Sequence, residues 1–271
     1  MRIPESERMN FGFAHQVHLY SDYSILVSDY LAHGTLQPGY CFTALNAIQD
    51  AINSNLILET LHDAAVIHGD FKPDNLMIRY ARFWSYAGIF LCVSFLGGWR
   101  TKFTLEVEDK DSFYECSGPW KEQGLCRVDW GRGIDLRLLP EDAKLVGDCR
   151  TSGFRCIEMQ ENKPWTFQVD TYGLCVIVHM ILHKSYMEIE KRPSPDGGYV
   201  YQPKTHLKRY MQVELWKNLF MKLLNTSPTE DHQSLLRNLR HSFQDYMCSN
   251  PQLIKKLKQL LVKQKNSLCS A

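Results

Sequence analysis

The stretch of sequence that decides the fold reads Val66-Ile67-His68-Gly69-Asp70-Phe71-Lys72-Pro73-Asp74-Asn75. A His precedes Asp70 by two residues, a Lys follows it by two and an Asn follows it by five. An isolated Asp and Asn would carry little information. Four polar residues in this register, directly behind an apolar pair, indicate a functional loop.

A second candidate element lies downstream of this loop. Residues 125–128 predict an apolar strand, which ends in Asp129-Trp130-Gly131. An Asp-x-Gly triplet alone usually marks a turn, but behind a strand and downstream of Asp70 it becomes a candidate metal-binding element. Residues 46–62 carry apolar side chains at helical spacing and predict a core helix that delivers the chain to His68. A short strand is expected over 76–78.

The composition excludes several classes of protein. The 271 residues suffice for one large domain or two small ones, and the net charge of +1 indicates no nucleic-acid partner. Nine cysteines are scattered without a C-x-x-C pair, which favours reduced thiols in a cytosolic or nuclear compartment over disulfides or a zinc site. The polar residues 1–10 show no signal peptide.

Further elements are predicted on both sides of the loop. Residues 16–20 and 24–27 predict two short strands around a turn, and residues 29–36 predict a linker into helical sequence. The polar stretches 109–115 and 117–123 are expected to be loops. Apolar spacing predicts helices over 166–182, 211–224, 234–247 and from Asn250 onward, with Asn250 as the N-cap and Pro251 as the first helical residue.

One segment interrupts the pattern. Residues 84–99 (WSYAGIFLCVSFLGGW) carry no charge. A bilayer span needs about 20 apolar residues, so the segment is short for a transmembrane helix. A buried hairpin, an apolar surface insertion or retained non-coding sequence also fits it. We expect no membrane association, and this segment is the feature that argues for one.

The spacing of His68, Asp70, Lys72 and Asn75 is the one that protein kinases use in their catalytic loop, H-R-D-x-x-x-x-N. Three motifs resemble more narrowly the kinase domain of the Bub family of mitotic spindle-checkpoint kinases: HGDFKPDN, VDWGRGIDL and CRTSGFRCIEMQENKPWTFQVDTYG. The resemblance covers about residues 66–80 and 125–268, and more loosely 16–36.

This resemblance implies an α+β, protein-kinase-like fold, mainly the helical C-lobe with a remnant of the β-rich N-lobe. Residues 1–33 would be the N-lobe remnant and hinge, and residues 34–271 the C-lobe. Residues 79–124 would be an atypical insertion between the catalytic loop and Asp129-Trp130-Gly131.

The resemblance also implies a role for each site residue. Asp70 would be the base that orients the substrate hydroxyl, and Lys72 would neutralise charge on the transferring phosphoryl group. Asn75 and Asp129 would hold Mg²⁺ against the phosphates of ATP. Thr151 would bridge Asp70 and Lys72, which favours Ser/Thr over Tyr specificity.

Two more regions follow from the same resemblance. The hinge would run through Asp29 and Leu31, where backbone groups meet the adenine of ATP. Asp170 would sit on the central buried helix and anchor the backbone of the catalytic loop. Cys156-Ile157-Glu158 stands where the family has Ala-Pro-Glu.

The chain departs from the family in several places. Gly69 stands where most kinases have an Arg that clasps an activation-loop phosphate, so we expect any activity to be independent of activation-loop phosphorylation. No Lys precedes Lys72, and only Gly12 precedes the hinge, so the Gly-rich loop and the Lys that hold ATP are missing. Asp70 and Asp129 lie 59 residues apart, farther than the family implies. These departures fit a fragment or an imperfect gene model of a larger checkpoint kinase, or a genuine short form.

Three functions remain open. The first is a Ser/Thr kinase domain of a spindle-checkpoint protein that uses ATP and Mg²⁺ on kinetochore or chromatin proteins, in the nucleus and at mitotic kinetochores, and otherwise in the cytoplasm. The second is a catalytically inactive, pseudokinase-like interaction module. The third is a small-molecule phosphotransferase of the aminoglycoside type, against which Lys72 and the spacing of Thr151, Glu158 and Asp170 count. We expect a monomeric domain without direct nucleic-acid contact.

Overall fold

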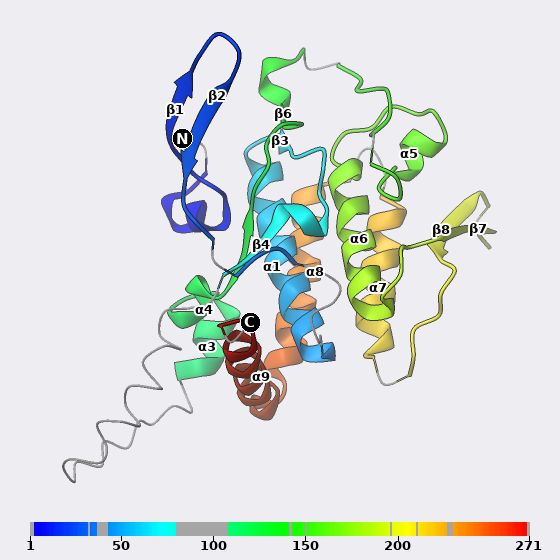
Figure 1. Cartoon of the computed structure of the whole chain (residues 1–271). Coiled ribbons are helices and arrows are strands. Elements are labelled where there is room, and N and C mark those ends of the chain that lie inside the picture. The colour runs from blue at the N-terminus through cyan, green and yellow to red at the C-terminus, as the bar shows by residue number, and fades with distance from the viewer. Residues whose placement is uncertain are drawn as a thin grey trace.

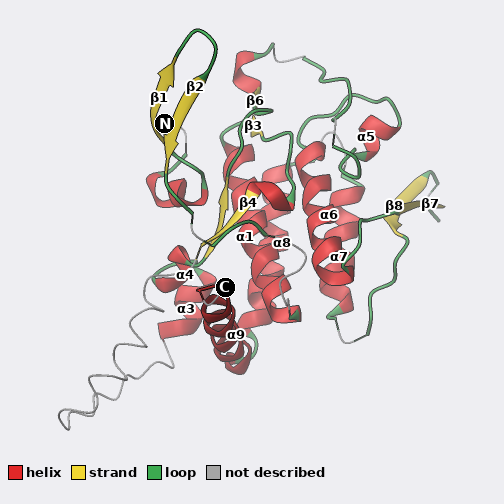
Figure 2. Ribbon diagram, viewed as in Figure 1, coloured by secondary structure: helices red, strands yellow, loops and turns green. Residues whose placement is uncertain are grey.

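The computed structural model describes residues 3–31, 33–36, 43–79, 108–140, 143–149, 151–195, 197–209, 211–226 and 230–269. Long helices form the body of this described part, and short strand pairs lie around them (Figures 1 and 2). The long helices are α1 (Ala44–Asp63), α6 (Gln168–His183), α7 (Val213–Leu224), α8 (His232–Cys248) and α9 (Pro251–Cys269). This mixture confirms the predicted α+β class.

Helix α1 is the central helix, and it packs against α6 and α8. It is the helix predicted over 46–62, and it begins after Thr43, whose side chain accepts a hydrogen bond from the N–H of Asn46. Its apolar stripe, including Ile48 and Ile52, is buried in the core. Its buried Glu59 accepts hydrogen bonds from Arg237 (2.8 Å) and Arg240 of α8, so α1 and α8 are joined by ion pairs as well as by apolar contact.

The other predicted helices are also present. Helices α6, α7 and α8 begin within about two residues of the predicted positions. Helix α9 begins at Pro251, as predicted. The side chain of Asn250 accepts a hydrogen bond from the N–H of Gln252 at 3.0 Å, which confirms its predicted capping role.

Two nested antiparallel strand pairs position the loops of interest. Strand β4 (Leu76–Arg79) pairs with β5 (Gly124–Arg127), and β3 (Val66–Ile67) pairs with β6 (Ile134–Asp135). The catalytic loop, residues 68–75, connects β3 to β4, and residues 128–133 connect β5 to β6. Because both ends of the two connections are paired, the loops must face each other.

The N-terminal hairpin lies apart from this core, at the upper left of Figure 1. It consists of β1 (Ala14–Leu19) and β2 (Ser24–Ser28), as predicted, and Val17 lies opposite Leu26. Every residue of both strands is exposed. The linker that follows returns to the core, where Thr35 bridges Met77 of β4.

The expectation of loops over 109–115 and 117–123 is wrong. The structure forms helix α3 (Glu108–Tyr114) and the short helix α4 (Pro119–Glu122). The rings of Phe113 and Trp120 meet edge to face at 4.9 Å, both are buried, and α3 packs against α8 and α9. Two buried aromatic anchors in otherwise polar sequence stabilise helices that the polar pattern did not predict.

Several elements had no sequence signal that we recognised. These are the 3₁₀ segments η1 (Glu5–Asn10), η2 (Pro73–Asn75) and η3 (Leu136–Leu138), the short helix α5 (Ile157–Gln160), and the hairpin of β7 (Ile189–Pro193) and β8 (Tyr199–Pro203). The apolar residues 84–99 lie outside the described residues. Among the described residues, no helix combines the length and the apolar character that crossing a bilayer requires.

Candidate active site

The carboxylate of Asp70 is the centre of the candidate site. Its Oδ2 accepts hydrogen bonds from Lys72 Nζ at 2.7 Å and from Asn75 Nδ2 at 3.1 Å. Its Oδ1 accepts one from Thr151 Oγ1 at 3.1 Å. The structure therefore brings together the four residues for which a catalytic role was predicted, one of them 81 residues away in the chain.

The charge of Asp70 is set by this arrangement. Burial acts to raise the pKa of Asp70, but the Lys72 ammonium, the Thr151 hydroxyl and the Arg132 guanidinium together hold that pKa below its usual value. The carboxylate is thus ionised at neutral pH. Lys72 and Thr151 bind different oxygens of Asp70. Among the described contacts, Thr151 therefore binds Asp70 but does not also bind Lys72, as the predicted bridge would require.

Asp170 of α6 fixes the backbone of the catalytic loop. Its Oδ2 accepts a hydrogen bond from the N–H of His68 at 2.7 Å, and its Oδ1 accepts one from the N–H of Gly69 at 2.9 Å. The carboxylate is fully buried, and His62 lies 3.4 Å from it. These contacts confirm the predicted anchoring role.

Arg127 is a second anchor, and sequence reasoning missed it. Its guanidinium is fully buried at the end of β5 and donates to the carbonyl oxygens of Asn75 (2.6 Å) and Asp70 and to Nδ1 of His68. Burial lowers the pKa of Arg127 to about 9, and Asp170 opposes that shift, so Arg127 remains charged. A charged residue inside the apolar run 125–128 was the signal that could have found it.

His68 is neutral in this setting. Burial, followed by the charge of Arg127, lowers the pKa of His68 to about 4. Its Nδ1 accepts hydrogen bonds from Arg127 and from the N–H of Asp70, which assigns the proton to Nε2, 3.3 Å from the carbonyl oxygen of Val128. The ring therefore links the catalytic loop to the residue before Asp129.

Asp129 lies on the neighbouring loop. The N–H of Val128 donates to the carbonyl oxygen of Asn75 at 3.1 Å, so the segments that carry the two predicted metal ligands are adjacent. Asp129 is exposed in a left-handed conformation, φ +62°, and its Oδ1 accepts a hydrogen bond from the N–H of Gly131. Because Nδ2 of Asn75 is used by Asp70, the amide oxygen of Asn75 is the atom that could face a cation.

The two predicted hinge residues are not brought to Asp70. The Asp29 carboxylate pairs with His15 of β1 at 2.8 Å and is largely exposed. Leu31 is partly buried. Within the described residues, neither side chain makes a hydrogen bond or an ion pair with the catalytic loop.

Gly69 is required by the backbone around it. It has φ +76°, and a Cβ at this position would lie 2.7 Å from the carbonyl oxygen of Arg132. An Arg here, as in most kinases, would therefore clash with the loop that follows Asp129. The close approach of the two facing loops therefore leaves no room for that Arg side chain.

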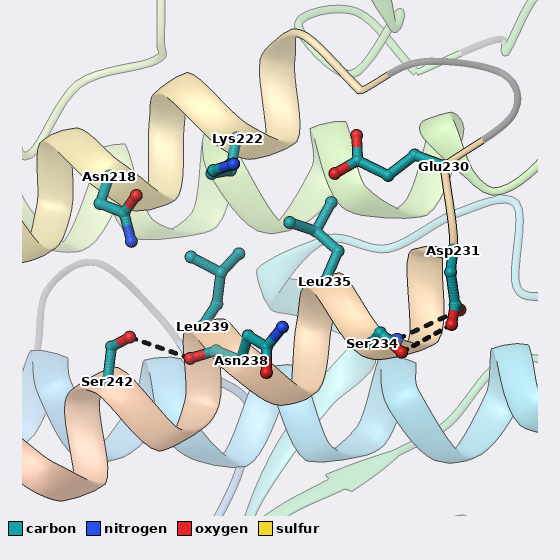
Figure 3. A pocket seen from close by; sticks show the side chains of 9 residues that line it. All are labelled: Asn218, Lys222, Glu230, Asp231, Ser234, Leu235, Asn238, Leu239 and Ser242. Carbon is teal, nitrogen blue, oxygen red and sulfur yellow. Dashed lines mark hydrogen bonds between the residues drawn. The ribbon is translucent and has the colours of Figure 1, made fainter.

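The hollow shown in Figure 3 lies away from these residues, between α7 and α8. One of its lining residues, Asp231, is occupied as the N-cap of α8, where it binds Ser234. None of the predicted site residues lines it. A second cavity, of about 250 Å³, lies beside the catalytic loop and is bordered by Gly69, Arg132 and Cys149.

The chain is similar in sequence to mitotic checkpoint kinases. No protein-family model matches it. The chain is 53% identical over 278 aligned residues to the mitotic checkpoint serine/threonine-protein kinase BUB1 of Arabidopsis thaliana, across 100% of this chain and 49% of that protein. It is 31% identical over 230 residues to the spindle assembly checkpoint serine/threonine-protein kinase bub1 of Schizosaccharomyces pombe, across 78% of this chain and 19% of that protein.

A solved structure agrees in fold. The crystal structure of a BubR1 kinase domain matches 96% of this chain and 70% of that chain with a TM-score of 0.75, at 23% sequence identity. The chain spans about half the length of the Arabidopsis relative and about a fifth of the yeast one. The sequence relatives and the shared fold together show that the chain belongs to the Bub family of mitotic checkpoint kinases, as a protein-kinase-like domain.

Proposed function

We propose that this domain transfers the γ-phosphoryl group of ATP to Ser or Thr hydroxyls, as the kinase domain of a mitotic spindle-checkpoint protein. The convergence of Lys72, Asn75 and Thr151 on the carboxylate of Asp70 is the observation that carries the proposal. Kinetochore and chromatin proteins are the substrates we propose, and a monomeric domain in the nucleus and at mitotic kinetochores is the setting. No contact with nucleic acid or membrane is part of the proposal.

Asp70 would act as the base. Its ionised carboxylate would orient the substrate hydroxyl and accept its proton while the hydroxyl oxygen bonds to the γ-phosphorus and ADP leaves. Lys72, whose Nζ lies 2.7 Å from Oδ2 of Asp70, would place its charge beside the transferring group. Thr151 would hold Oδ1 of Asp70 and keep the chain around Thr151 beside the base.

Asn75 and Asp129 would hold the metal. An amide oxygen and a carboxylate are hard oxygen donors, which fit Mg²⁺. Mg²⁺–ATP, when bound, supplies the phosphoryl group and neutralises its charge. Among the described residues no group of three His, Cys, Asp or Glu side chains forms a metal site, so the ATP phosphates would complete the ligand set. The backbone at Asp29 and Leu31 would meet the adenine.

A second candidate function is a catalytically inactive interaction module. The described residues before Lys72 include no Lys, and the β1–β2 hairpin is exposed on both faces. These observations favour weak nucleotide binding. The intact set around Asp70 favours the kinase. The aminoglycoside-type phosphotransferase is supported by His68-Gly69-Asp70 alone.

Nucleotide binding and transfer separate these functions. We expect Mg²⁺–ATP to raise the melting temperature of the protein, Asp129→Ala to abolish that rise, and the hairpin-turn variant Asp22→Ala to keep it. We expect phosphate on Ser or Thr of core histones, and none with Asp70→Asn. A thermal shift without transfer would support the inactive module, and transfer to an amino-sugar alone would support the third function. The absence of both the thermal shift and phosphate transfer would contradict the kinase function.

Activity should not depend on activation-loop phosphorylation. Because Gly69 replaces the Arg that would clasp such a phosphate, phosphatase treatment of the purified protein is expected to leave the transfer rate unchanged. Mass spectrometry of the treated and untreated protein checks that phosphate was removed. A rate that falls with the phosphate would contradict this part of the proposal.

A further inference from the structure

Arg132 lies where the two facing loops meet the segment around Thr151. It is the third residue after Asp129, and its carbonyl oxygen fills the space beside Gly69. Its Nη1 lies 3.9 Å from Oδ1 of Asp70 and 3.4 Å from Oγ1 of Thr151. The side chain is 39% exposed, so it is accessible without being part of the core.

The two oxygens of Asp70 are held by different parts of the chain. Oδ2 is held from within the catalytic loop, by Lys72 and Asn75. Oδ1 faces Thr151 and Arg132, which are 19 residues apart and belong to separate segments. The guanidinium of Arg132 is thus a charged group that contacts both the Asp70 carboxylate and the Thr151 hydroxyl.

We propose that Arg132 is a positioning residue that holds the Thr151 segment on Asp70, in place of a phosphorylated activation loop. The geometry at Gly69 excludes the Arg that would read such a phosphate from the catalytic loop. Arg132 supplies a cation from the facing loop, directed at the Asp70–Thr151 contact. Its effect on catalysis rests on the proposed kinase function, but its effect on segment order does not.

Cys149 provides a reporter that needs no catalysis. It lies two residues before Thr151, lines the same cavity as Arg132, and its Sγ donates to the carbonyl oxygen of Thr151 at 3.6 Å. The side chain is only partly exposed. If the chain around Thr151 is released from Asp70, the Cys149 thiol becomes accessible to a maleimide. Cys116, at the α3–α4 turn, is also partly buried but lies away from this site, so it serves as the internal control.

The test compares Arg132→Gln, Arg132→Lys and the matched control Arg137→Gln. Arg137 is an exposed Arg on η3, five residues after Arg132 in the chain. Peptide mass spectrometry would follow N-ethylmaleimide labelling of the full chain. We expect labelling of Cys149 to be about tenfold faster in Arg132→Gln, because one charge-assisted contact is lost. The labelling rate of Cys116 should not change in any variant, and the labelling rate of Cys149 should not change in Arg137→Gln. In Arg132→Lys, the labelling rate of Cys149 should return toward that of the unsubstituted protein.

Steady-state kinetics supply the second readout. A positioning role predicts that Arg132→Gln lowers kcat by about tenfold and leaves KM for ATP unchanged, since Arg132 acts through Asp70 and Thr151. Equal labelling of Cys149 in Arg132→Gln and Arg137→Gln would overturn the inference even if the protein is an active kinase. Accelerated labelling in a protein that transfers no phosphate would uphold the role of Arg132 in segment order while the proposed function fails.

Discussion

The catalytic loop, residues 68–75, and the β1–β2 hairpin differ in how far away in the chain their partners lie. The loop is held by Asp170 of α6, by Arg127 of β5 and by Thr151, all more than 50 residues distant. Among the described residues, the hairpin strands pair only with each other, and Leu19 and Leu26 are 80% and 62% exposed. The loop geometry is therefore imposed by the tertiary structure, whereas the hairpin is specified locally and is marginal by itself.

Removal of the Asp170 carboxylate, which holds the catalytic loop from α6, is expected to lower the free energy of unfolding more than any other change considered for the two regions. Asp170→Ala leaves the buried N–H groups of His68 and Gly69 without a partner. We expect the free energy of unfolding to fall by about 2–6 kcal/mol, because two buried donors are left unsatisfied at about 1–3 kcal/mol each. Urea unfolding followed by circular dichroism measures it.

The matched control lies in the hairpin. Asp29→Ala removes an ion pair with His15 that is exposed on both sides, so we expect a loss of at most about 1 kcal/mol. Similar losses in the two variants would contradict the difference between the two regions.

The catalytic loop is also expected to make the stability of the protein depend on pH, through His68. Because the folded-state pKa of His68 is lowered from 6.5 to about 4, the unfolded chain takes up the proton first as the pH falls. The stability that neutral His68 contributes is fully present above pH 6.5 and is lost as the pH falls toward 4, by up to about 3 kcal/mol. The side chain faces Arg127, Asp170 and Asp70, of which only Arg127 opposes protonation.

Urea unfolding at several pH values between 4.5 and 7.5 checks this prediction. His68→Asn should show a shallower loss of stability over that range. Burial likewise lowers the pKa of His232 in α8 to about 4, and its contribution is common to both proteins. The same slope with and without His68 would show that the ring is not the titrating group.

The smallest effect tests the contact between the facing loops. Gly69 and Gly197 both have a positive φ, +76° and +86°, but a Cβ at Gly69 would meet the carbonyl oxygen of Arg132 at 2.7 Å while one at Gly197 would meet nothing within 4 Å. We expect Gly69→Ala to destabilise the protein by about 1–2 kcal/mol more than Gly197→Ala. Melting temperatures of the two variants decide it, and equal shifts would argue against the close approach.

The sequence predicted the long helices and the loop motif because both carry local signals. A stripe of apolar residues such as Ile48 and Ile52 specifies a helix face, and the spacing from His68 to Asn75 specifies a loop. Helices α3 and α4 escaped prediction because their stability comes from burying Phe113 and Trp120 against each other and against neighbouring helices. That is a tertiary effect, which polar local sequence conceals.

The candidate site shows the same division. The residues of the catalytic loop were predicted from spacing, and Thr151 and Asp170 were predicted from the family resemblance. Arg127 and Arg132 were not, because their roles depend on the pairing of β4 with β5 and of β3 with β6. A single sequence gives the residue type at those positions but not the register that turns each side chain toward the loop.

The nested strand pairs also bear on how the distance from Asp70 to Asp129 can vary. Arg79 and Gly124 are direct partners in the β4–β5 ladder, so the ends of the connection through residues 80–123 are adjacent. Closing such a connection costs entropy that grows only with the logarithm of its length, about 0.6 kcal/mol for each doubling. Outside the packed helices α3 and α4, a longer connection between these strands therefore costs little entropy, and the register on which both loops depend is kept.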